Sequence, residues 1–134
     1  MVNAATRRTV LVADDEPEHA EIVATLLTRR GFLVQVVHST SEAIDLALAE
    51  PPPELVLLDV YMPGSDGVAV AGRLRTEPRT ANVPIVLVTA SPDAHVLRAQ
   101  ESLDVVVLEK PFHTAELLWA VEVALARRAA EERA

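Results

Sequence analysis

The chain has 134 residues, of which 50% are apolar, enough for a single domain with one hydrophobic core. It contains no cysteine, which excludes disulfide frameworks, thiolate zinc sites and cysteine nucleophiles. Its net charge of −8 repels phosphate backbones, so we expect no direct binding to nucleic acid. The N-terminal MVNAATRR lacks the apolar run of a signal peptide, and no apolar stretch approaches the roughly 18 residues that span a bilayer. We therefore expect a cytoplasmic protein without membrane insertion.

The first half of the chain predicts three strands and two helices. Residues 9–13 form a buried-strand run, and Pro17 stands where the first turn of a helix would begin. Apolar residues at helical spacing carry that helix to Arg30, and Gly31 ends it. Residues 33–37 predict a second strand, Ser41 can cap a second helix, and the prolines at 51–53 stop it. A third strand, apolar on both faces, is predicted over 55–58.

The second half continues the same alternation. Turn-forming residues predict a loop over 62–67, then a helix to about Thr76 that is broken at 77–78. Strands are predicted over 85–88 and 105–108, with Ser91-Pro92 as the start signal of the helix between them. A last helix follows Lys110-Pro111, and residues 127–134 form a charged, alanine-rich tail. The pattern predicts a doubly wound α/β fold, with a five-stranded parallel sheet of order 2-1-3-4-5 and five helices.

Polar residues stand directly after four of the five predicted strands. They are Asp14-Asp15, Asp59, Thr89 and Glu109-Lys110. The carboxyl ends of parallel strands share one edge of the sheet, where doubly wound folds hold their ligands. His38-Ser39, after the predicted edge strand, shows no comparable chemistry. Asp and Thr often follow strands only as turn or cap residues, but four such ends together favour one pocket.

The chemistry of that pocket points to phosphoryl transfer. Three clustered carboxylates repel one another unless one is protonated or a cation binds, and oxygen ligands suit Mg²⁺ or Mn²⁺. A lysine beside such a cation implies an anion between them, to which the Thr89 hydroxyl could donate a hydrogen bond. Asp59 stands alone at the end of the central strand, so it is the candidate nucleophile, with Asp14 and Asp15 on the metal side.

Four motifs in this order, VADDEP, LLDVYMPGSDG, LVTAS and EKPF, resemble the CheY-like receiver domain of two-component response regulators. The resemblance covers about residues 8–128 and implies a single receiver domain over 1–134. It implies that Asp59 is the phosphoacceptor in a Mg²⁺-dependent reaction, that the metal is held by Asp14, Asp15, Asp59 and the backbone carbonyl of Tyr61, and that Thr89 swings toward the phosphoryl group. Lys110 would pair with that group, and Lys110-Pro111 would be a cis peptide.

The resemblance also implies partners. The donor would be a sensor histidine kinase or a histidine phosphotransfer protein, and the signal would pass to an effector protein or to an output domain beyond this chain. Homodimerisation through the last two helices stays open. The domain would be a signalling switch rather than an enzyme, although it has intrinsic phosphotransfer and autodephosphorylation chemistry.

Three features depart from the family pattern. Val107 stands where a tyrosine or phenylalanine usually moves inward with the threonine, so switching must be weaker or use other means. Ser102-Leu103 replaces a small Gly-Ala pair. The positions that tune phosphoryl lifetime are Tyr61 and Ser91, and neither is an acid or amide that would readily position a water, so we expect slow autodephosphorylation.

Two other functions stay open from the residues alone. A flavodoxin-like module for a nucleotide or flavin has the same fold class, although 3% aromatic residues are few for stacking a flavin. A phosphatase or transferase using an aspartyl phosphate would need a second acid where Tyr61 stands. We interpret His19, His38, His95 and His113 as plain surface residues, and Trp119 as a half-buried boundary residue or a partner contact.

Overall fold

The computed structural model describes residues 8–62 and 65–133. In chain order the elements are β1 (Thr9–Ala13), α1 (Pro17–Arg29), β2 (Leu33–Val37), α2 (Thr40–Ala47), β3 (Leu55–Asp59), β4 (Tyr61–Met62), β5 (Ser65–Asp66), α3 (Gly67–Thr76), β6 (Ile85–Thr89), α4 (Ala94–Ser102), β7 (Val106–Glu109) and α5 (Thr114–Arg133). No helix among these described residues is long and apolar enough to cross a membrane.

The five long strands form one parallel sheet in the order β2-β1-β3-β6-β7. This confirms the predicted order, with β6 and β7 as the predicted fourth and fifth strands. The central strands β3 and β6 are buried along their whole length, as expected for strands covered on both faces. They run one residue further than predicted, so Asp59 and Thr89 are the last residues of their strands rather than loop residues.

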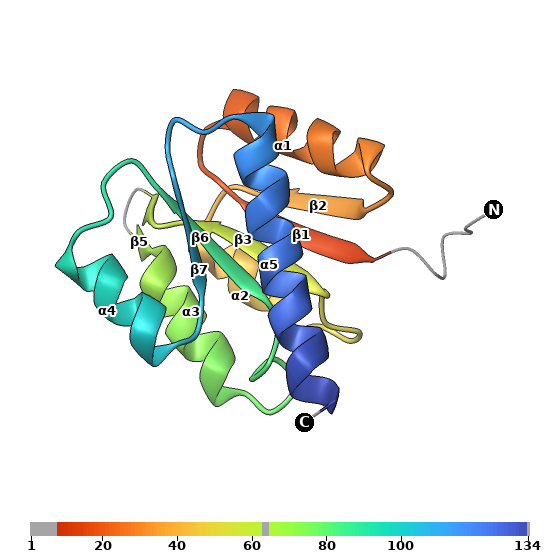
Figure 1. The fold of residues 1–134 in the computed structure, drawn as a ribbon, viewed down its shortest axis with the longest axis vertical. Coiled ribbons are helices and arrows are strands. Elements are labelled where there is room, and N and C mark those ends of the chain that lie inside the picture. Colours follow the sequence, from red (N-terminus) through yellow and green to blue (C-terminus); the bar gives the residue numbers. More distant parts are fainter. Residues whose placement is uncertain (1–7, 63–64, 134) are drawn as a thin grey trace.

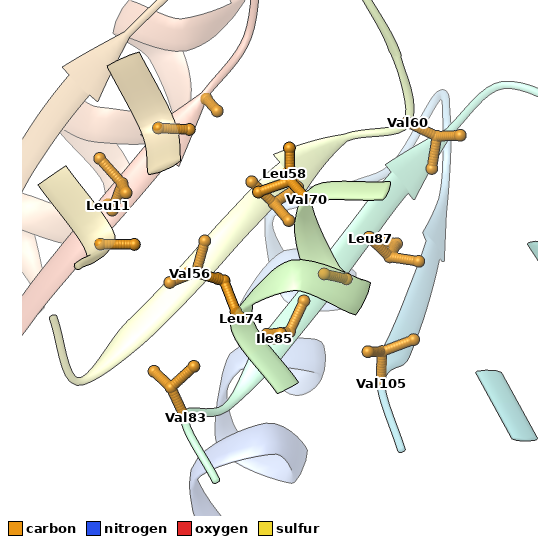
Figure 2. Packing of buried hydrophobic residues seen from close by; sticks show 14 of the residues in the cluster. Leu11, Val56, Leu58, Val60, Val70, Leu74, Val83, Ile85, Leu87 and Val105 are labelled. Atoms are coloured by element: carbon orange, nitrogen blue, oxygen red, sulfur yellow. The ribbon is translucent and has the colours of Figure 1, made fainter. Parts of the chain in front are cut away.

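Helices cover both faces of the sheet, which makes the fold doubly wound (Figure 1). On one face α1 and α5 pack against the sheet, with Leu27 and Leu117 fully buried between the layers. On the other face α2, α3 and α4 cover the sheet; Figure 2 shows Val70 and Leu74 of α3 lying over Leu58 and Ile85 of the strands. Burying aliphatic side chains on both faces fixes the sheet as a rigid frame for its carboxyl edge.

Two helix starts differ from the predictions. The cap of α2 is Ser39, not Ser41: its hydroxyl accepts the Glu42 N–H at 3.2 Å and donates to the Glu42 carboxylate at 3.0 Å. The first of these bonds satisfies one free backbone donor of the first helical turn, and Ser39 and Glu42 have the spacing of a capping box. The helix also ends at Ala47, before the prolines.

The cap of α4 is Asp93, so Ser91-Pro92 precedes the helix instead of opening it. A carboxylate at this position accepts the Val96 N–H and also favours the positive end of the helix dipole. The predicted loop over 62–67 contains a short antiparallel ladder between β4 and β5, while residues 63 and 64 lie outside the described chain.

Candidate functional site

The carboxyl edge of the sheet brings the predicted polar residues together. Asp14 follows β1, Asp59 ends β3, Thr89 ends β6, and Lys110 follows β7. The strand register explains the meeting, because Asp59 pairs with Val88 in β6, one residue before Thr89. Side chains separated by 21 residues or more in sequence thus share one crevice, the position that doubly wound folds use for ligands.

An acidic cluster forms one side of this crevice. Asp14, Asp15 and Asp59 each offer a carboxylate oxygen, and these oxygens lie within 4.8 Å of one another. Asp14 is 3% exposed and Asp59 is 7% exposed, so their mutual repulsion is poorly screened by water. Hard, all-oxygen donors of this kind fit Mg²⁺ or Mn²⁺, which would also relieve that repulsion.

Lys110 faces the acidic cluster from the end of β7. Its Nζ donates to Asp59 Oδ2 at 3.0 Å, and it is the only lysine of the chain. Burial raises the pKa of the Asp59 carboxyl above its ordinary value, which the hydrogen bond and charge of Lys110 oppose and the charge of Asp14 reinforces. The cation therefore helps to keep Asp59 ionised, the state in which a carboxylate is a nucleophile. The Lys110–Pro111 peptide is cis, as predicted.

The Thr89 hydroxyl is turned toward its own loop. It is fully buried, donates to the Ser91 carbonyl at 3.3 Å and accepts the Ser91 N–H at 3.1 Å. Both interactions would compete with a hydrogen bond to a group on Asp59. Thr89 would have to leave Ser91 in order to contact such a group.

Two histidines contact Asp14: His19 is half-buried, unlike the plain surface residue predicted, whereas His38 is exposed as predicted but still makes a contact. His19 Nδ1, from the first turns of α1, contacts the Asp14 carboxylate. His38 Nδ1 donates to the Asp14 backbone carbonyl at 2.9 Å, so the end of β2 does take part in the site. The Glu16 N–H holds the other Asp14 oxygen at 3.0 Å. The rule that found the other strand ends also applied to His38, which directly follows β2 beside β1.

The other singled-out residues lie further from the acidic cluster. His95 and His113 are both exposed, as predicted, although His95 Nε2 also contacts Asp66 Oδ2 at 2.7 Å. Val107 is half-buried and packs on the α2–α3–α4 side of the sheet. Trp119 is 60% exposed, more than a half-buried boundary residue, and the second interpretation, a partner contact, stays a prediction.

Tyr61 lies at the rim of the crevice, 51% exposed, with its backbone N–H donated to Asp59 Oδ1 at 3.3 Å. Its hydroxyl donates to the Asp93 carboxylate. This hydrogen bond is the main cause that raises the pKa of the phenol above its ordinary value of 10.0, because ionisation would place two negative charges side by side. The same bond lowers the pKa of Asp93.

We expect this pairing to be visible in an ultraviolet titration, because Tyr61 is the only tyrosine. The phenol should stay neutral to a higher pH than free tyrosine, and Asp93→Asn should lower its midpoint toward the ordinary value. Asparagine is a matched substitution, since it also caps helices well and should leave α4 intact. Equal midpoints in the two proteins would show that the hydrogen bond does not form in solution.

Comparisons with known proteins agree with this geometry. The sequence profile of the response regulator receiver domain matches residues 10–122. The chain is 38% identical over 123 residues to the DNA-binding response regulator MtrA of Mycolicibacterium smegmatis, which covers 90% of this chain and 52% of that protein. It is 38% identical over 130 residues to the transcriptional regulatory protein GltR of Pseudomonas aeruginosa, covering 94% of this chain and 52% of that protein.

A solved structure shares the fold. The chemotaxis response regulator CheY4 of Vibrio cholerae superimposes with a TM-score of 0.81 at 23% identity, over 90% of this chain and 100% of that one. The chain spans about half the length of the curated relatives it matches. A profile match over most of the chain and relatives well above 30% identity agree with the motifs at the sheet edge. The chain belongs to the response regulator receiver domain family of two-component signalling.

Proposed function

We propose that this chain is a receiver domain that accepts a phosphoryl group on Asp59 and changes conformation in response. The observation that carries the proposal is the position of the Asp59 carboxylate, buried at the end of the central strand between two further carboxylates and the only lysine. Family membership favours this function over a flavin-binding module or an aspartyl phosphatase.

The reaction follows from the charges in the crevice. An ionised Asp59 oxygen attacks the phosphorus of a phosphohistidine donor. The bond from phosphorus to the histidine nitrogen breaks, and the leaving imidazole takes a proton from solvent. Asp14, Asp15, Asp59 and the Tyr61 carbonyl would hold Mg²⁺ or Mn²⁺, which neutralises charge on the phosphoryl oxygens when bound. Lys110, whose Nζ lies 3.0 Å from Asp59 Oδ2, would supply positive charge to the phosphoryl oxygens. Thr89 then donates its hydroxyl to the phosphoryl group.

The donor we propose is the phosphohistidine of a sensor kinase or of a histidine phosphotransfer protein. MtrA is named as a DNA-binding response regulator, and this chain corresponds to about half of its length. We propose that the signal likewise passes to an output domain or a separate effector. The receiver core would be residues 8–128, with 127–134 as a helical tail.

The direct test is intact-mass spectrometry after incubation with a small phosphodonor. We expect a gain of one phosphoryl group that requires Mg²⁺ and disappears in Asp59→Asn and after chelation of the metal. Asp45→Asn, at an α2 position outside the crevice, is the control and should be labelled like the unmodified protein. Equal labelling of Asp59→Asn would overturn the assignment of the acceptor.

A further inference from the structure

Two aspartates cap the helices that follow β5 and β6. Asp66 caps α3, with Oδ1 accepting the Val68 N–H at 2.8 Å. Asp93 caps α4, with Oδ1 accepting the Val96 N–H at 3.1 Å. Capping uses one carboxylate oxygen of each residue and leaves the other free to bind elsewhere.

The remaining oxygens join the β4–β5 segment to the start of α4, one in each direction. Asp66 Oδ2 contacts His95 Nε2 of α4 at 2.7 Å, and Asp93 Oδ2 accepts the hydroxyl of Tyr61 in β4. Each side thus contributes one capping acid and one ring. We call these four residues, Tyr61, Asp66, Asp93 and His95, the cap clasp.

The cap clasp connects the segment that follows Asp59 with the segment that follows Thr89. On one side Tyr61 is two residues from Asp59 and donates its N–H to Asp59 Oδ1. On the other side Asp93 is two residues after Ser91, whose backbone binds the Thr89 hydroxyl in both directions. Residues 90–93 are therefore held to Thr89 at one end and to Tyr61 at the other.

We propose that the cap clasp holds residues 90–93 in the conformation in which Thr89 binds Ser91, and that it opens when Asp59 carries a phosphoryl group. The inference rests on the proposed function and adds the element that transmits it. Val107 has no ring to move, whereas Tyr61 has one at the rim of the same crevice, held by a single side-chain hydrogen bond. Breaking one such bond shifts a two-state equilibrium by about fivefold, small enough for a phosphoryl group to reverse.

The test compares ¹H–¹⁵N spectra of the unmodified protein, Tyr61→Phe and His95→Ala, each with Mg²⁺ and with or without beryllofluoride, a phosphoryl analogue. Each variant removes one bond of the cap clasp and keeps both capping aspartates. Without beryllofluoride, we expect the Thr89 and Ser91 amide resonances of both variants to lie part of the way toward their beryllofluoride-bound positions. Both variants should also bind beryllofluoride about fivefold more tightly. His113→Ala, at the exposed start of α5, should match the unmodified protein.

Resonances of Thr89 and Ser91 that stay at their unmodified positions in both variants would overturn the cap clasp, as would weaker beryllofluoride binding by both. An unmodified protein whose spectrum does not respond to beryllofluoride would overturn the proposed function itself, and the cap clasp with it. The two failures are therefore distinguishable.

Discussion

Lys110→Ala is expected to slow phosphoryl acceptance on the order of a hundredfold while the domain stays folded. Lys110 is 20% exposed at its side chain and donates to Asp59 Oδ2 at 3.0 Å, facing the acidic side of the crevice. Its removal leaves the developing charge on the phosphoryl oxygens without its nearest cation in a poorly solvated place. It also removes the interaction that opposes the upward shift of the Asp59 pKa, so a smaller fraction of Asp59 is ionised at a given pH.

The measurement is the rate of mass gain with a small phosphodonor in saturating Mg²⁺, at several pH values. The loss should be largest at low pH. Without Lys110 the pKa of Asp59 rises further, so a larger fraction of Asp59 is protonated there and cannot act as a nucleophile. Lys110→Arg tests whether charge alone suffices, and we expect it to restore only part of the rate, since a planar guanidinium cannot reproduce the point contact of an ammonium. An unchanged rate in Lys110→Ala would show that Lys110 does not assist the transfer.

The strands and their chemistry could be predicted from sequence because both depend on local patterns. Aliphatic runs mark buried parallel strands, and the shared carboxyl edge then places Asp14, Asp59, Thr89 and Lys110 in one crevice without further information. The meeting of the three carboxylates and the contact of Lys110 with Asp59 follow from that rule.

The features that the sequence did not predict depend on the rotation of a helix about its axis or on contacts between residues far apart in the chain. Whether His19 points at Asp14 depends on the rotation of α1 about its axis, which the apolar periodicity fixes only approximately. The contacts between Tyr61 and Asp93 and between Asp66 and His95 span 32 and 29 residues, so no local spacing announces them. The cap of α2 could have been predicted from sequence, since Ser39 and Glu42 have capping-box spacing. Ser41, however, is a second candidate for the same role.

Gly67→Ala is expected to destabilise the domain by about 2–3 kcal/mol. Gly67 is the first residue of α3, and its N–H donates to the Val60 carbonyl at 2.7 Å. A Cβ there would lie 2.5 Å from the Asp59 carbonyl oxygen and 3.0 Å from the Val60 Cα. Both are backbone atoms of the central strand end, so relief requires moving α3 or the backbone that carries the phosphoacceptor.

Gly72→Ala in the same helix is the matched control. A Cβ at Gly72 meets nothing within 4 Å, and alanine is favoured over glycine inside a helix, so this variant should be more stable by about 0.5–1 kcal/mol. Urea unfolding of both variants measures the two signs side by side. Because the clash falls on the Asp59 backbone, Gly67→Ala should also lower phosphoryl acceptance under conditions where it is fully folded, whereas Gly72→Ala should not. A Gly67→Ala protein as stable as Gly72→Ala would mean that α3 does not approach the end of β3 this closely, and the position of Asp59 would then not depend on that glycine.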